Sequence, residues 1–166
     1  NGIGKTTLLR ILTEQIAAQS GDYLWGTGVR LGYFDQQQSG LCLEKTVLQE
    51  LQDAFPALDT QVLRSRLGAF LFRGDEVYQR IGSLSGGERS RVALLKLLLG
   101  QANVLVLDEP TNHLDADSCR ALEAALCEYH GTVLFVSHDR YFINTIATRV
   151  LEIAEEGCTQ YLGDWD

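Results

Sequence analysis

The 166-residue sequence lacks several features that define specialised classes of protein. It has no methionine and only two prolines, and its longest apolar runs, 104–107 and 133–136, are far shorter than the roughly 20 residues of a membrane-spanning helix. Its four cysteines are widely spaced without a CxxC or Cys/His pattern, so they indicate neither a zinc site nor a disulfide framework. We expect buried or half-buried free thiols, a reducing, cytoplasmic location and no direct membrane insertion.

Positive charge is also scarce, with 14 Lys and Arg against 22 Asp and Glu and a net charge of −8. Electrostatic binding to nucleic acid needs clustered Lys and Arg that neutralise phosphates, so the domain as a whole is not expected to bind RNA in this way. Any RNA contact is therefore expected to be local or to lie in sequence outside this chain. The length suits one domain with a substantial core.

The hydrophobic pattern predicts an α/β fold, because short apolar strands alternate with helical segments as in a mainly parallel sheet with crossover helices. Strands are expected within 23–36 and at 104–107, 132–136 and 149–153, and helices at 6–18, 85–99, 116–129 and 140–147.

The middle of the sequence changes character. Segments 46–54 and 60–72 are predicted to be helical, with a break at Pro56 between them. We therefore expect residues 41–83 to form a helical subdomain. The single domain 1–166 would then have an α/β core made of 1–40 and 84–166.

The first residues, Asn-Gly-Ile-Gly-Lys-Thr-Thr, match the end of the phosphate-loop pattern GxxxxGK[ST], and we expect the loop to be cut at its N-terminal side. Small residues let backbone N–H groups surround phosphates at a helix N-terminus. Lys5 is expected to reach the β and γ phosphates and Thr6 to coordinate Mg²⁺, with Thr7 the less favoured ligand. By itself the motif could be a glycine turn that caps a helix. The residues predicted at the phosphates are Asn1, Gly2, Gly4, Lys5, Thr6 and Thr7.

A second signal follows the apolar strand 104–107, which places Asp108 and Glu109 at its carboxyl end, where open α/β sheets bind ligands. Asp108 suits the Mg²⁺ shell, directly or through a water. Glu109 is a candidate to orient and deprotonate an attacking water. Acidic strand ends are common, so this assignment depends on the order of the other motifs.

A third signal is Leu-Ser-Gly-Gly-Glu at 84–88, which opens a predicted helix. The Ser85 hydroxyl, the N–H groups of Gly86 and Gly87 and the helix N-terminus can together form an anion site. The same run also reads as a Ser-capped helix start in which Glu88 completes a capping box. The two roles are compatible.

In this order, the motifs resemble those of the ATP-binding cassette (ABC) ATPases over nearly the whole chain. The resemblance equates 4–6 with Walker A, 84–88 with the signature and 108–109 with Walker B. It implies a P-loop cassette that binds ATP and Mg²⁺, with the signature covering ATP held by a partner cassette.

The resemblance also assigns three single residues. Gln36 matches the Q-loop glutamine, which would meet Mg²⁺ or water, with Gln37 and Gln38 as alternatives if the register slips. Asp115 matches the D-loop, and His138 matches the switch histidine, which would hydrogen-bond the γ-phosphate. His113 and His130 are expected to be structural or surface residues.

Further details resemble the ABC-F subfamily, whose members are two-cassette proteins without a membrane domain. These are Glu88 and the segments Gly-Tyr-Phe-Asp-Gln at 32–36, Pro-Thr-Asn-His-Leu-Asp at 110–115 and Ser-His-Asp-Arg-Tyr-Phe at 137–142. The stretch between Gln36 and Ser85 is too short for the long arm that many first cassettes carry. We therefore expect a second, C-terminal cassette, cut within Walker A.

The subfamily resemblance implies ATP hydrolysis in a protein whose two cassettes pair within one chain. It further implies action on the ribosome through an interdomain linker outside this sequence, in translation or in antibiotic-resistance ribosome protection. The alternative is the ATP-binding subunit of a transporter. A scaffold that binds ATP without hydrolysing it is a third possibility, against which the intact Glu109 argues.

Overall fold

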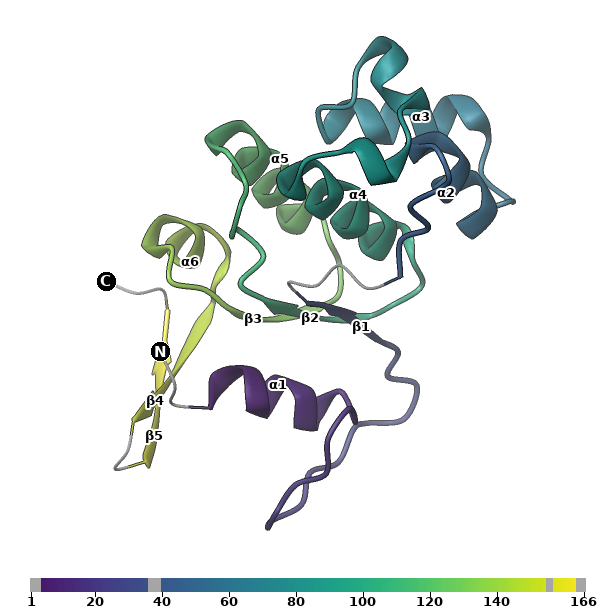
Figure 1. Cartoon of the computed structure of the whole chain (residues 1–166). Coiled ribbons are helices and arrows are strands. Elements are labelled where there is room, and N and C mark those ends of the chain that lie inside the picture. Colours follow the sequence, from purple (N-terminus) through teal and green to yellow (C-terminus); the bar gives the residue numbers. More distant parts are fainter. Residues whose placement is uncertain (1–3, 36–39, 155–156, 164–166) are drawn as a thin grey trace.

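The computed structural model describes residues 4–35, 40–154 and 157–163 (Figure 1). Its helices are α1 (Lys5–Leu12), α2 (Val47–Ala54), α3 (Thr60–Ala69), α4 (Gly86–Leu99), α5 (Ala116–Cys127) and α6 (Arg140–Ile146), with 3-10 turns at Gly74–Tyr78 and Ile81–Ser83. Its strands are β1 (Leu31–Phe34), β2 (Val104–Asp108), β3 (Thr132–Val136), β4 (Arg149–Ala154) and β5 (Gly157–Leu162).

A parallel sheet of order β1-β2-β3 forms the centre of the molecule, with α1 on one face and α4, α5 and α6 on the other (Figure 1). Every residue of β2 is buried, as expected for a strand covered on both faces. The predicted α/β fold with a parallel sheet is confirmed.

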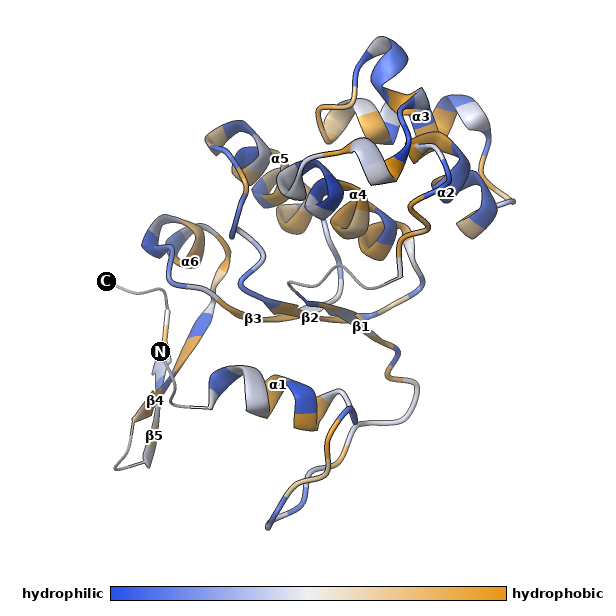
Figure 2. Ribbon diagram, in the orientation of Figure 1, coloured by the Kyte–Doolittle hydropathy of each residue, from blue (hydrophilic) through white to orange (hydrophobic). Residues whose placement is uncertain are grey.

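The two faces of β2 contribute to two separate cores. Leu105 and Leu107 belong to the large cluster formed with α4, α5 and the helices above them, whereas Val104 and Val106 pack with Leu9 of α1. Strands β1 and β2 and the inner sides of the helices are largely apolar in Figure 2. Gly32 lets β1 approach α4 closely, because a Cβ there would lie 2.7 Å from Cδ1 of Leu97.

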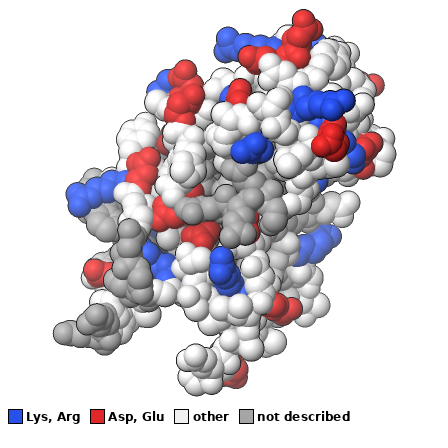
Figure 3. Space-filling view, viewed as in Figure 1, with Lys and Arg blue, Asp and Glu red and all other residues white. Residues whose placement is uncertain are grey.

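Helices α2 and α3 pack above α4 and share its core cluster (Figure 1). Each begins at a side-chain cap, Thr46 for α2 and Asp59 for α3, because these side chains accept hydrogen bonds from the orphan N–H groups of the first turn. The predicted starts of both helices are confirmed. Acidic and basic side chains are interspersed over this block on the face shown in Figure 3.

The N-terminal prediction gave too long a helix and too much strand. Helix α1 ends at Leu12 rather than at residue 18, and within 23–36 the only described strand is β1. Tyr23 donates from its hydroxyl to the carbonyl oxygen of Ile11 (2.7 Å), and Trp25 donates from Nε1 to that of Leu12 (2.9 Å). The aromatic residues that suggested a strand instead satisfy the last carbonyls of α1.

The C-terminal strand prediction was wrong in its pairing. β4 lies outside the parallel sheet and pairs with β5 in an antiparallel hairpin, with Arg149 opposite Leu162. Strands adjacent in sequence pair at a small loop-closure cost.

The cysteine prediction was half right, since all four thiols are free but only Cys119 is partly buried. The other three, Cys42, Cys127 and Cys158, are exposed. No helix among the described residues is long and apolar enough to cross a membrane.

Candidate nucleotide site at the ends of β2 and β3

Asp108 closes β2 with its carboxylate almost fully buried, at 6% exposure. It follows Val106 by two residues, so its side chain points to the face of the sheet that α1 covers. Its Oδ1 has no hydrogen-bond partner among the described residues. A buried carboxylate oxygen without a partner is costly unless a cation or donor joins it.

Glu109 turns the chain sharply at the end of β2, because its φ of 49° lies in the left-handed region that non-glycine residues rarely adopt. Its N–H still donates to the carbonyl oxygen of Val136 in β3 (2.9 Å). Backbone strain of this kind is concentrated at functional sites. It directs the Glu109 side chain toward the end of β3.

His138, far away in sequence, meets Glu109 at this edge. The ring Nε2 of His138 lies 3.2 Å from Glu109 Oε1, and the backbone N–H of His138 donates to Glu109 Oε2 (3.3 Å). The pair arises because β2 and β3 are parallel neighbours that end at the same edge of the sheet. Of the three residues predicted to be catalytic, Gln36 lies outside the described residues, and the other two are brought together. The side chain of Glu109 is nearly buried at 12% exposure and that of His138 is exposed at 57%.

The start of α1 has no side-chain cap from the part of the chain that the structure describes. Gly4 precedes it in the left-handed region (φ 92°). Lys5 is partly buried, and Thr6 and Thr7 are exposed in the first turn. Uncapped N–H groups at a helix N-terminus attract anions. The other predicted phosphate contacts, Asn1 and Gly2, lie outside the described residues, as does Gln36.

The start of α4 is different, because two of its backbone N–H groups have side-chain partners within the same turn. Ser85 Oγ accepts from the Glu88 N–H (3.3 Å), and Glu88 Oε2 accepts from the Ser85 N–H (2.7 Å), which is the predicted capping box. These bonds with Ser85 lower the pKa of Glu88. Ser85 and Gly86 remain exposed and accessible to a partner.

Gly87 connects this helix start to the loop after β2. A Cβ on Gly87 would lie 2.5 Å from the carbonyl oxygen of His113, whose own φ is 65°. Two residues later, Asp115 caps α5 by accepting from the Ser118 N–H (2.8 Å), which lowers the pKa of Asp115. The side chains of His113 and His130 are exposed, consistent with the surface role expected for them.

These residues fit Mg²⁺ and a nucleotide. Among the described residues no group of three or more His, Cys, Asp or Glu is arranged to hold a metal, but Mg²⁺ at phosphates typically needs only one or two carboxylates. The unpartnered Oδ1 of Asp108 supplies such a ligand, and the uncapped α1 faces the same side of the sheet.

Sequence reasoning did not single out Tyr33 on β1. Its hydroxyl is buried without a hydrogen-bond partner among the described residues. Burial and then the nearby charge of Asp108 raise the pKa of Tyr33, and the Arg10 guanidinium acts in the opposite direction. The alternation of side chains along β1 could have indicated it. Tyr33 pairs with Val106, two residues before Asp108 on the neighbouring strand, so the two side chains are expected on the same face of the sheet.

A parallel sheet with a helix start and two carboxylates at one side defines a nucleotide-binding cassette of the P-loop type. The family described as ABC transporter matches residues 1–112. The chain belongs to this ATP-binding cassette family, and its relatives identify it with a second cassette of the ABC-F subfamily.

Among these relatives, YdiF of Bacillus subtilis is 55% identical over 166 residues, which are 100% of this chain and 26% of YdiF. The energy-dependent translational throttle protein EttA of Escherichia coli K12 is 41% identical over 97% of this chain and 30% of its own. ABC transporter F family member 5 of Arabidopsis thaliana is 42% identical over 100% of this chain and 24% of its own. The chain thus spans about a quarter to a third of these relatives.

Solved structures agree with this fold. The RNase-L Inhibitor superposes with a TM-score of 0.76 at 26% identity, over 98% of this chain and 33% of its own. The archaeal ribosome recycling factor aABCE1, in complex with the ribosomal stalk protein aP1, gives 0.73 at 29% identity, over 91% and 30%.

Proposed function

We propose that this cassette binds ATP with Mg²⁺ and hydrolyses ATP in a protein where two cassettes pair. The observation that carries the proposal is the Glu109–His138 pair, next in sequence to Asp108, whose Oδ1 has no hydrogen-bond partner within the described ranges. A scaffold that only binds ATP has no need of a strained, nearly buried glutamate at this edge.

The proposed chemistry divides between the two ends of the site. Lys5 and the α1 N-terminus bind the β and γ phosphates, and Thr6 and Asp108 hold Mg²⁺. When bound, the metal neutralises charge that develops on the phosphates. The phosphate-contacting set is Asn1, Gly2, Gly4, Lys5, Thr6 and Thr7, and Gln36 contacts Mg²⁺ or water.

Glu109 accepts the proton of the attacking water. The Nε2–H of His138 lies 3.2 Å from the Glu109 carboxylate and is proposed to turn to the γ-phosphate when nucleotide is bound, because a neutral imidazole has a single N–H to donate. In this arrangement Glu109 is the base and His138 orients it, a division of roles found in other sites where a base is held by a third group.

The start of α4 serves a nucleotide on the partner cassette. Ser85, Gly86 and Gly87 are proposed to contact its γ-phosphate, and Asp115 lies in the adjoining loop at the same interface. The exposure of Ser85 and Gly86 supports this role. The partner is proposed to be the first cassette of the same chain. Residues 41–83 are proposed to form the helical subdomain, with 1–40 and 84–166 as the α/β core.

The ribosome is the proposed target of the whole protein, in the cytoplasm, with rRNA or tRNA contacts made by a linker. Support comes from two similar proteins, since EttA is named a translational throttle protein and aABCE1 a ribosome recycling factor. Translation control and antibiotic-resistance ribosome protection are both compatible with it. The alternative, a transporter subunit, would use the same chemistry with a membrane partner.

The test is Glu109→Gln in the complete two-cassette protein. ATP binding is expected to persist while steady-state turnover at this site falls by about 100-fold or more, the effect of losing a general base. The matched control is Glu128→Gln at the exposed end of α5, which should turn over ATP normally. ATP-dependent co-sedimentation with ribosomes should increase in Glu109→Gln. Normal turnover would refute the assignment, and unchanged sedimentation would refute the ribosomal role.

A further inference from the structure

Glu50 of α2 is a buried charge far from Asp108 in sequence, at 3% exposure. Lys96 of α4 donates from Nζ to its Oε1 at 2.6 Å. This is the most buried acid–base pair among the ion pairs of the described residues.

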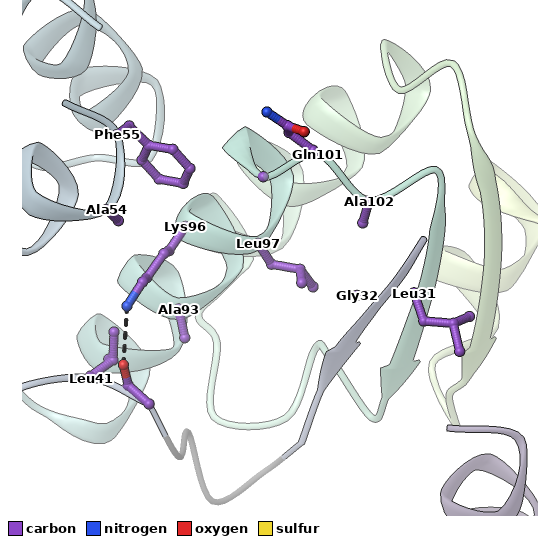
Figure 4. A pocket seen from close by; sticks show the side chains of 12 residues that line it. Leu31, Gly32, Leu41, Ala54, Phe55, Ala93, Lys96, Leu97, Gln101 and Ala102 are labelled. Atoms are coloured by element: carbon purple, nitrogen blue, oxygen red, sulfur yellow. Dashed lines mark hydrogen bonds between the residues drawn. The ribbon is translucent and has the colours of Figure 1, made fainter. Parts of the chain in front are cut away.

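The same two side chains also hold the segment that leads from β1 to α2. Lys96 Nζ donates to the carbonyl oxygen of Gly40 (3.1 Å), the dashed line in Figure 4, and the Cys42 N–H donates to Glu50 Oε2 (3.4 Å). One ammonium and one carboxylate therefore join α2, α4 and residues 40–42.

Other contacts also reach residues 40–42, since Leu41 packs against the main core cluster and the Cys42 carbonyl oxygen accepts from the Lys45 N–H (3.1 Å). A Cβ on Gly40 would meet no atom within 4 Å, and Cys42 is exposed. Beside Lys96 lies a pocket of about 470 Å³, lined in part by Leu41, Phe55 and Leu97, so side-chain packing leaves space there (Figure 4). Residues 40 and 42, on either side of Leu41, are therefore held by the polar tie, which adds to the packing of Leu41.

A buried ion pair is weak evidence for stability, since an apolar replacement of both partners is often neutral or stabilising. We therefore expect the role of the Glu50–Lys96 pair to lie in the positions of the segments that it joins. The chain reaches residues 40–42 directly after the stretch that holds Gln36, and α4 carries Ser85 at its other end.

We propose that Glu50 and Lys96 are a positioning pair that sets residues 40–42 relative to α4, and thereby the rate of ATP turnover at this cassette. The role in turnover rests on the proposed ATPase function. Neither residue belongs to the set proposed to contact the nucleotide, so the effect is expected on kcat rather than on the KM for ATP.

The test compares the apolar double variant Glu50→Leu/Lys96→Met with the wild type in the complete protein. Its midpoint of denaturant unfolding should be equal or higher. Its kcat should fall by about three- to thirtyfold with little change in KM, the range for residues that couple sites indirectly. Single Lys96→Met should be less stable, because it leaves Glu50 buried and unpaired.

The matched control is the exposed pair between Lys45, which lies just before α2, and Asp53 of α2, at 2.9 Å. Lys45→Met/Asp53→Asn should leave kcat unchanged. Hydrogen exchange provides a readout independent of turnover, since amides at 41–43 should exchange faster in the apolar variant while α4 keeps its protection.

A stable apolar variant with wild-type kcat would overturn the positioning role, and unchanged exchange at 41–43 would overturn the tie itself. If the wild type hydrolyses no ATP, the proposed function and the role in turnover fail together. The exchange measurement still decides in that case whether the pair holds the segment.

Discussion

The end of β2 and the start of α4 are both assigned to nucleotide, yet their polar groups are satisfied in opposite ways. At the end of β2, Asp108 keeps a buried oxygen that has no partner in the described part of the chain, and the backbone of Glu109 is strained. At the start of α4, Ser85 and Glu88 satisfy each other in a capping box.

The difference separates two kinds of site. The β2 end is incomplete by itself and gains from a bound cation, so variants there should change function more than stability. The α4 start already has a capping box between Ser85 and Glu88, so variants of these residues should change both stability and function. Three substitutions test this contrast.

The largest effect is expected from Asp108→Asn, which removes the negative charge beside the proposed Mg²⁺. Mg²⁺ affinity in the ATP complex should fall by about 100-fold, whereas the free energy of unfolding should stay the same or rise by about 1 kcal/mol. Isothermal titration and denaturant unfolding measure these quantities. Asp75→Asn, on an exposed 3-10 turn, is the control. A marked loss of stability with normal Mg²⁺ affinity would make Asp108 structural.

An intermediate effect is expected from Ser85→Ala, which removes one cap of α4. Stability should fall by about 1 kcal/mol. Thr46→Ala, in the matching capping box of α2, should lose a similar amount. Only Ser85→Ala should also slow hydrolysis at the site of the partner cassette. If the two variants hydrolyse ATP equally fast at the partner site, the only role of Ser85 is to cap α4.

The smallest effect is a pH dependence at Glu88. Its pKa is lowered from the ordinary 4.5 by the hydrogen bonds with Ser85, so its ionised form stabilises the folded state above pH 4.5. That contribution is lost as pH falls through the lowered pKa. Since the Glu88 side chain is 36% exposed, we expect a few tenths of a kcal/mol. Unfolding of Glu88→Gln from pH 7 to pH 3 should lack this component; an identical profile would contradict it.

Sequence patterns predicted the parts of the fold that local signals determine. Helix α4 begins directly after Ser85, and β3 has its predicted bounds, because a capping box and a short apolar run are local features. Glu109 and His138 were each predicted as site residues, and their contact with each other is a finding of the structure, in which parallel strands end at the same edge. The motif order supplied the roles proposed for them.

Features that depend on tertiary contacts could not be predicted in this way. The bonds from Tyr23 and Trp25 to α1, the close approach of Gly87 to His113 and the Glu50–Lys96 pair all join residues that no local pattern connects. β4 carries strand-like residues, but its pairing with β5 rather than with the parallel sheet is a matter of topology.

The central claim is that Glu109 is the base of an ATP-hydrolysing site at the end of β2. It is tested most directly by single-turnover phosphate release from the complete protein with saturating Mg²⁺ and ATP. The account predicts that Glu109→Gln binds ATP but releases phosphate from this site about 100-fold more slowly than the wild type or Glu128→Gln. Phosphate release at the wild-type rate would contradict it.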